Sequence, residues 1–224
     1  MAESGPPRVA ALLLNWRRAD LTLRCLPDLL AVPAPAMTVV VIDNGSGDAE
    51  TAALRTGIAN ALRTRPGRHC VELLALPDNR GFTGGMNAGF QRAHALGSDY
   101  ALVLNNDLQL GPDFLQPLVA VLDTDASVAA VGPTVLHPDG TVWAQGGRTA
   151  FGPNGLVLGD HGQQPAPTTS GPEPVGFLPG ACVLFRTAQV HELGGFDDRY
   201  FMYWEDVDLG ARLRARFGSI VWLP

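Results

Sequence analysis

Small polar clusters follow four apolar segments of the chain: Asn15, Asp43-Asn44, Asp78-Asn79 and Asn105-Asn106-Asp107. Asp and Asn are ordinary turn and helix-capping residues, so one such cluster would mean little. If the apolar segments are neighbouring parallel strands, however, all four clusters lie at one edge of a sheet. That edge is where open α/β sheets bind their ligands. The pattern therefore predicts a shared binding pocket.

Asp107 is the candidate metal ligand. A single carboxylate at a strand end suits Mg²⁺ or Mn²⁺ shared with substrate phosphates, because these hard ions keep waters and take one or two protein oxygens. The chain has no lysine, so a bound phosphate must be neutralised by arginine, a metal ion or a helix N-terminus. The alternative is that Asp107 only caps the turn before a helix expected from Pro112.

A glycine-rich segment, Gly81-Phe82-Thr83-Gly84-Gly85, joins a predicted strand to a predicted helix. Backbone N–H groups and the helix dipole at such a position bind phosphate. The spacing GxxGG is not the dinucleotide fingerprint GxGxxG, and a tight turn with glycines for close packing explains it equally well. Arg80 and Asn87 beside the glycines favour a ligand.

Three acids, Glu205, Asp206 and Asp208, open a predicted helix, where the helix dipole stabilises them. Glu205 and Asp206 point about 100° apart around a helix, so they do not share one task. Aromatic neighbours such as Trp204 would partly desolvate a carboxylate and raise its pKa and basicity. One of these acids is therefore a candidate general base.

The elements that must position these groups alternate between strand and helix. Apolar runs predict strands at 9–14, 38–42, 71–76, 100–104 and 131–136. Helical spacing predicts helices between them at 21–30, 49–62, 85–96 and 112–122. This alternation implies an α/β protein with a doubly wound, mostly parallel sheet. After 136 we expect a hairpin-like turn, a mobile loop at 152–174, strands at 175–185 and 220–223, and helices at 187–193 and 205–216.

The composition limits the class of protein. With 224 residues, 46% apolar and 17% charged, the chain is expected to fold as a globular domain. A net charge of −6 argues against a nucleic-acid partner. Cys25, Cys70 and Cys182 are far apart, which indicates thiols in a reducing cytosol rather than disulfides or a zinc cluster. No apolar stretch reaches the roughly 18 residues of a membrane-spanning helix, so a soluble or at most peripheral protein is expected.

In order and spacing, these segments resemble the family 2 glycosyltransferases, particularly their rhamnosyltransferase-like branch. The matching segments are 13–16, 41–46, 78–89, 104–107, 180–182 and 195–212. The resemblance implies a GT-A fold, with a short mixed or antiparallel C-terminal portion. It also implies one domain over 1–224, with a nucleotide-sugar half at 1–136 and an acceptor half at 137–224. The implied reaction is metal-assisted transfer of a sugar, with inversion, from a UDP- or dTDP-sugar to a glycan or a lipid-linked acceptor. The expected location is cytoplasmic, including the inner face of the membrane.

The resemblance also implies roles for individual residues. Asn15 and Asp43 would contact the base and ribose. The residues bordering the nucleotide would be Asn44, Asp78, Asn79, Gly81, Gly84 and Asn87. Asn105, Asn106 and Asp107 would lie at the diphosphate, with Asp107 on the metal. Asp206 would be the general base beside Glu205. The acceptor or sugar would be contacted by Gly180, Ala181, Trp204 and Asp208.

Two departures keep other functions open. Asn105 replaces the first acid of the family's DxD motif, and the chain ends at Pro224, before the metal-binding His and helices that relatives often carry. A truncated nucleotide-sugar-binding module is therefore an alternative. A sugar nucleotidyltransferase fits less well, because its triphosphate site would need more positive charge than a lysine-free chain offers. The transferase hypothesis requires Asp43, Asp107 and Asp206 to meet around one cavity.

Overall fold

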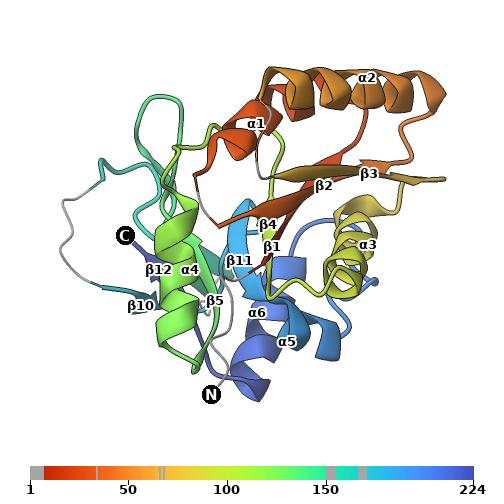
Figure 1. Cartoon of the computed structure of the whole chain (residues 1–224). Helices are drawn as coiled ribbons and strands as arrows, with labels where there is room; N and C mark the ends of the chain where they lie inside the picture. Colours follow the sequence, from red (N-terminus) through yellow and green to blue (C-terminus); the bar gives the residue numbers. More distant parts are fainter. Residues whose placement is uncertain (1–7, 34, 66, 68, 150–154, 166–170) are drawn as a thin grey trace, which may run out of the picture.

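The computed structural model describes residues 8–33, 35–65, 67, 69–149, 155–165 and 171–224, and shows a central sheet covered by helices on both faces (Figure 1). The strands of the main sheet are β1 (Val9–Asn15), β2 (Met37–Asn44), β3 (Cys70–Leu76), β4 (Tyr100–Leu104), β5 (Val128–Pro133), β10 (Glu173–Pro174), β11 (Cys182–Arg186) and β12 (Ser219–Leu223). Short strands β6 (Val135–Leu136), β7 (Val142–Ala144), β8 (Gly147–Thr149) and β9 (Leu156–Leu158) form two hairpins. The helices are α1 (Ala19–Ala31), α2 (Asp48–Thr64), α3 (Gly81–Ala95), α4 (Leu115–Thr124), α5 (Thr187–Glu192) and α6 (Glu205–Arg216).

The sheet order is β10-β12-β5-β11-β4-β1-β2-β3. Strands β4, β1, β2 and β3 are parallel, so their carboxyl ends lie at one edge. Strand β11 runs antiparallel to both β4 and β5, and β10 runs antiparallel to β12. The predicted α/β class, with a mostly parallel sheet and an antiparallel C-terminal portion, is therefore confirmed.

The core consists of two apolar layers, one on each face of the sheet. Alternate residues of β1 point to opposite faces because side chains alternate along a strand. Leu13 packs with α1, α2 and α4, whereas Leu12 packs with α3, α5 and α6. Because both faces are covered, β1 and β2 read as continuous apolar runs rather than alternating ones.

Helix α3 begins at Gly81, four residues earlier than predicted, so the expected glycine loop is the first turn of the helix. The Asn79 side chain accepts a hydrogen bond from the Gly81 N–H (2.9 Å) and thus satisfies a free donor of that turn. At Gly89, a Cβ would lie 2.6 Å from the Ile42 side chain. The glycines therefore allow α3 to pack closely against the sheet, which is the alternative reading of this motif.

Other predicted boundaries were also wrong. Helix α4 begins at Leu115, not at Pro112, and the expected strand at 131–136 is β5 at 128–133 followed by the short β6. The expected strand at 175–185 is continuous only as β11, from 182 onward, because Pro179 and Gly180 interrupt the run. Of the predicted mobile loop, 152–154 and 166–170 lie outside the described residues, while β9 and β10 form within it. No described helix is long and apolar enough to cross a membrane.

Candidate active site

A buried hydrogen-bond network joins the ends of β1, β2 and β4. The side chain of Asn106 donates to Thr22 Oγ1 (2.9 Å), and Thr22 donates to Asn15 Oδ1 (2.8 Å). Asn15 in turn donates to Asp43 Oδ1 (3.4 Å). Asn15 and Asp43 are 0% and 1% exposed, so this network fixes the shape of the edge from within.

The end of β2 is also tied to the start of α3. The Asn44 amide donates to Asn79 Oδ1 (3.0 Å) and to the Gly81 carbonyl (2.9 Å), and it accepts from the Arg80 N–H (3.1 Å). Asp78, next to Asn79, is exposed and pairs with Arg80. The structure thus brings together Asn44, Asp78, Asn79 and Gly81, as the sequence predicts, and Gly84 follows in the same helical turn.

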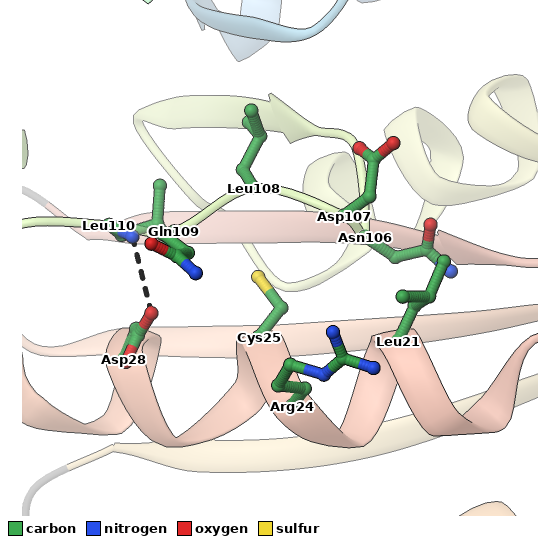
Figure 2. A pocket seen from close by; sticks show the side chains of 9 residues that line it. All are labelled: Leu21, Arg24, Cys25, Asp28, Asn106, Asp107, Leu108, Gln109 and Leu110. Atoms are coloured by element: carbon green, nitrogen blue, oxygen red, sulfur yellow. Dashed lines mark hydrogen bonds between the residues drawn. The ribbon is translucent and has the colours of Figure 1, made fainter. Parts of the chain in front are cut away.

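Asp107 is exposed between two cavities. A cavity of about 390 Å³ lies between α1 and the segment 106–110, with Cys25 and Arg24 in its wall (Figure 2). A second cavity of about 870 Å³ lies on the other side of this segment and is lined by Asn105, Asp107 and Ala181 among others. Figure 2 shows the carboxylate of Asp107 directed away from α1. Asp107 can therefore meet a ligand at the edge of the sheet.

The base candidate is linked to this segment through two backbone hydrogen bonds. The Gly180 N–H donates to Asp206 Oδ2 (3.2 Å), and the neighbouring Ala181 carbonyl accepts from the Asn105 N–H (2.9 Å). Asp206 and Asn105, two residues before Asp107, are thus bonded to adjacent residues, Gly180 and Ala181. Asp107 lines both cavities, whereas Asp43 and Asp206 line neither, so the predicted meeting of the three carboxylates around one cavity is not found at these two cavities.

Glu205 and Asp206 differ in exposure. Burial raises the pKa of both carboxyl groups, and for Asp206 the Gly180 N–H partly offsets this rise. Glu205 is 6% exposed, and its Oε2 has no hydrogen-bond partner among the described residues. Asp206 is half-buried. Of the two, Asp206 is therefore the one that a substrate can reach.

The residues before this pair are strained. Tyr203 and Trp204 have φ values of 73° and 72°, a left-handed conformation that costs a non-glycine residue about 1–3 kcal/mol. The two residues are 74% and 49% exposed. Such strain persists only where the surroundings impose it, and it is concentrated at functional sites.

Two further predicted site residues, Asp208 and Asn87, also have partners within the protein. Asp208 pairs with Arg212 one helical turn later, at 2.7 Å. The Asn87 amide is bonded to Phe196 and Asp198, so both of its polar atoms are engaged. Contacts of Asp208 or Asn87 with substrate stay predictions.

The residues at this edge suit a hard divalent cation that the protein binds weakly. No group of three His, Cys, Asp or Glu side chains that could hold a metal occurs in the described part of the chain. Asp107 offers a single exposed carboxylate, which suits Mg²⁺ or Mn²⁺ completed by waters and substrate phosphates. The thiol of Cys25 is no competitor, because burial, with Asp28 and Asp107 adding, raises its pKa to about 12.

Two further residues of this network, Thr22 and Thr51, were not predicted from the sequence. Thr22 bridges Asn15 and Asn106, and Thr51 donates to Asp43 Oδ2. Both lie on helices, α1 and α2. The sequence around a threonine in a helix does not show whether its hydroxyl bridges other side chains or faces solvent. The one available signal is that Thr22 stands among apolar residues on the buried side of α1.

Comparison with known protein families gives the class of this protein. The family model described as "Glycosyl transferase family 2" matches residues 14–194. The chain therefore belongs to glycosyl transferase family 2 and is a glycosyltransferase by class.

Among relatives, it is 31% identical over 220 residues to an N-acetylglucosaminyl-diphospho-decaprenol L-rhamnosyltransferase of Mycobacterium tuberculosis, covering 90% of this chain and 68% of that protein. It is 29% identical to the O-antigen biosynthesis protein RfbC of Myxococcus xanthus, covering 95% of this chain and 16% of that protein.

Solved structures share the fold. The mannosyltransferase PcManGT of Pyrobaculum calidifontis, in complex with GDP-Man and Mn²⁺, aligns with a TM-score of 0.69 at 19% identity. S. aureus TarS 1-349 in complex with UDP-GlcNAc aligns with a TM-score of 0.61 at 15% identity. The alignments cover 99% and 95% of this chain, and the chain spans 57% and 55% of those structures.

Proposed function

We propose that the protein transfers a sugar from a nucleoside-diphosphate donor to an acceptor hydroxyl, with inversion at the anomeric carbon. Asp206 accepts the proton of the acceptor hydroxyl while that oxygen attacks C1 of the sugar. The bond from C1 to the diphosphate oxygen breaks, and the nucleoside diphosphate leaves. A divalent ion held by Asp107 would neutralise charge on that leaving group.

The observation that carries this proposal is the backbone bridge between the two acids. Asp206 is held at Gly180, and Asn105, near Asp107, is held at Ala181. A base and a metal-binding carboxylate on adjoining segments suit an in-line displacement, in which nucleophile and leaving group occupy opposite sides of one carbon. The raised pKa of Asp206 strengthens it as a proton acceptor.

The donor half is assigned to the ends of β1, β2 and β4. Asn15, Asp43, Asn44 and Asn79 shape this edge, and we assign the base and ribose of a UDP- or dTDP-sugar to it. Because lysine is lacking, the metal and Arg18, the residue immediately before α1, neutralise the diphosphate. Asp20 and, more weakly, Asp107 raise the pKa of Arg18, which places Arg18 within electrostatic reach of Asp107.

We assign the acceptor to the side of Gly180, Ala181 and the exposed Trp204, where an aromatic face can stack on a sugar. By analogy with the decaprenol-linked substrate in the name of the M. tuberculosis relative, a lipid-linked glycan is the proposed acceptor class. Such an acceptor implies a cytoplasmic enzyme that works at the inner face of the membrane. The exposed run 201–204, Phe-Met-Tyr-Trp, is the surface we would expect to face it.

The test is a panel of UDP-, dTDP- and GDP-sugars, titrated by calorimetry with and without Mn²⁺. We expect one class of donor to bind, with higher affinity when Mn²⁺ is present. Release of nucleoside diphosphate should follow once an acceptor glycan is added. If no donor binds under any metal condition, the proposal is wrong; donor binding without transfer to any acceptor would favour the binding-module alternative.

A further inference from the structure

We propose that one side of α3, made of Gly81, Phe82, Thr83 and Asn87, is a clamp that positions the general base. We call these four residues the α3 clamp. Their function in this proposal is to hold the segment 193–204, which leads directly into Glu205 and Asp206. The role in catalysis rests on the proposed function above, whereas the mechanical role does not.

Asn87 is the centre of the clamp. Its Nδ2 donates to the Phe196 carbonyl (2.9 Å) and to Asp198 Oδ1 (2.8 Å), and its Oδ1 accepts from the Phe196 N–H (2.8 Å). These partners lie more than 100 positions further along the chain. The glycine at position 195 leaves room for Asn87, because a Cβ there would lie 2.3 Å from Asn87 Oδ1. One amide thus makes three hydrogen bonds to the segment, two to the backbone of Phe196 and one to the side chain of Asp198.

The first turn of α3 binds the next part of the segment, at Tyr200 and Phe201. The Phe82 N–H donates to the Phe201 carbonyl (2.8 Å), and the Thr83 hydroxyl donates to the Tyr200 carbonyl. Gly81 has a φ of 70°, and a Cβ at this position would lie 2.3 Å from the Phe201 carbonyl oxygen. The glycine is therefore required both by the backbone conformation and by the close approach of the segment.

The other end of the segment is fastened to the helix that carries the base. Arg212 of α6 donates to the carbonyls of Leu193 (3.2 Å) and Gly195 (2.9 Å) while it pairs with Asp208. Residues 193–201 are thus bound by α3 on one side and by α6 on the other. This double attachment explains how the left-handed backbone conformation of Tyr203 and Trp204 is maintained immediately before the base.

The same turn of α3 is also tied to the donor edge. The Asn44 amide, next to Asp43, bonds to the Gly81 carbonyl and to Asn79. A continuous chain of contacts therefore runs from the end of β2 through α3 to the segment before Asp206. In this proposal, the glycine-rich motif, for which phosphate binding was one prediction from the sequence, serves instead to place the base relative to the donor edge.

The mechanical part is tested by hydrogen exchange on the full chain. In Asn87→Ala, amide exchange in 193–208 should rise at least tenfold, while exchange in β1 and β2 stays unchanged. Gln91→Ala is the matched control, because Gln91 is an exposed amide on the next turn of the same helix; it should leave 193–208 unchanged. Thr83→Val, which keeps the side-chain shape but removes the hydroxyl, provides a second variant if Asn87→Ala does not fold. Unaltered exchange at 193–208 in a folded clamp variant overturns the clamp.

The catalytic part is tested with the donor that the panel identifies. In Asn87→Ala, donor affinity should stay within twofold while kcat falls at least tenfold. The acid limb of the kcat–pH profile should move to lower pH, because a loosened segment admits water to Asp206 and relieves the burial that raises its pKa. Raised exchange with unchanged kcat and pH profile would overturn the positioning role. If wild-type protein binds no donor, the proposed function fails, but the exchange result still decides on the clamp.

Discussion

At the scale of single residues, the two adjacent acids at the start of α6 are separated by their surroundings. Asp206 is half-buried and bonded to the Gly180 N–H, so it can ionise and still meet a substrate. Glu205 is buried, with one oxygen lacking a partner among the described residues. Burying a carboxylate with an unpaired oxygen lowers stability, and proteins retain such groups where function needs them.

Glu205→Gln should stabilise the protein at neutral pH. Burial raises the folded-state pKa of Glu205 above its ordinary value of 4.5, so the folded state holds the proton more tightly than the unfolded state. Stability is therefore lost as the pH rises from about 4.5 through the folded pKa. Gln does not ionise, so thermal unfolding should show a gain of up to about 1 kcal/mol at pH 7 that disappears near pH 4.

The control for this prediction is Glu192→Gln, an exposed carboxylate paired with Arg216. Such surface pairs contribute about 0–1 kcal/mol, so this change should have little pH-dependent effect. A Glu205→Gln variant that is less stable than wild type at pH 7 and equal to it at pH 4 would show that the ionised carboxylate stabilises the fold.

The positions of single residues were predictable where a polar residue ends an apolar run. Asn15 and Asp43 end continuous apolar runs, and the structure places both at the carboxyl edge of the sheet. The hydrogen-bond partners of Asn87 were not predictable, because they lie at Phe196 and Asp198 and no local pattern links such distant positions.

At the scale of elements, α4 depends on a side chain from β11. The Arg186 guanidinium donates to the carbonyls of Leu122 (2.6 Å), Asp125 (3.0 Å) and Val128 (2.8 Å). Carbonyls at a helix C-terminus lack intrahelical partners, and a cation there also complements the helix dipole. Arg186 therefore joins the end of α4, the start of β5 and β11.

Arg186→Ala should destabilise the fold by about 1–3 kcal/mol, because it leaves partly buried carbonyls without a partner. Arg186→Lys should recover part of the loss, since an ammonium group cannot reproduce the planar fork of donors. Urea unfolding measures both changes. Arg216→Ala, which removes an exposed ion pair with Glu192 and a cation–π contact with Phe217, is the control. An equal loss in the control would contradict the capping role.

The strands were more predictable than the helix boundaries. Buried β1, β2 and β4 are visible as β-branched and aliphatic runs, whereas α3 starts within glycines that disfavour a helix. Its first turn forms because Asn79 accepts the Gly81 N–H and because the glycines allow close packing on the sheet. The run at 175–185 looked like one strand since its apolar residues outweighed Pro179 and Gly180, which interrupt it.

At the scale of the whole molecule, the two predicted halves share one sheet. Strand β5 of the first half lies between β11 and β12 of the second, and β11 also pairs with β4. The antiparallel insertion of β11 brings Gly180 and Ala181 to the carboxyl end of β4, beside Asn105. That meeting of distant segments depends on strand order, which the sequence pattern alone does not determine.

The central claim is that Asp107 and Asp206 serve one donor in separate roles, and donor titration of two variants tests it most directly. Calorimetry with the donor found in the panel should show that Asp107→Ala abolishes the Mn²⁺-dependent gain in affinity. Asp206→Asn should bind donor like wild type, yet release no nucleoside diphosphate when acceptor is present. Equal loss of donor binding in both variants, or full turnover by Asp206→Asn, would contradict the account.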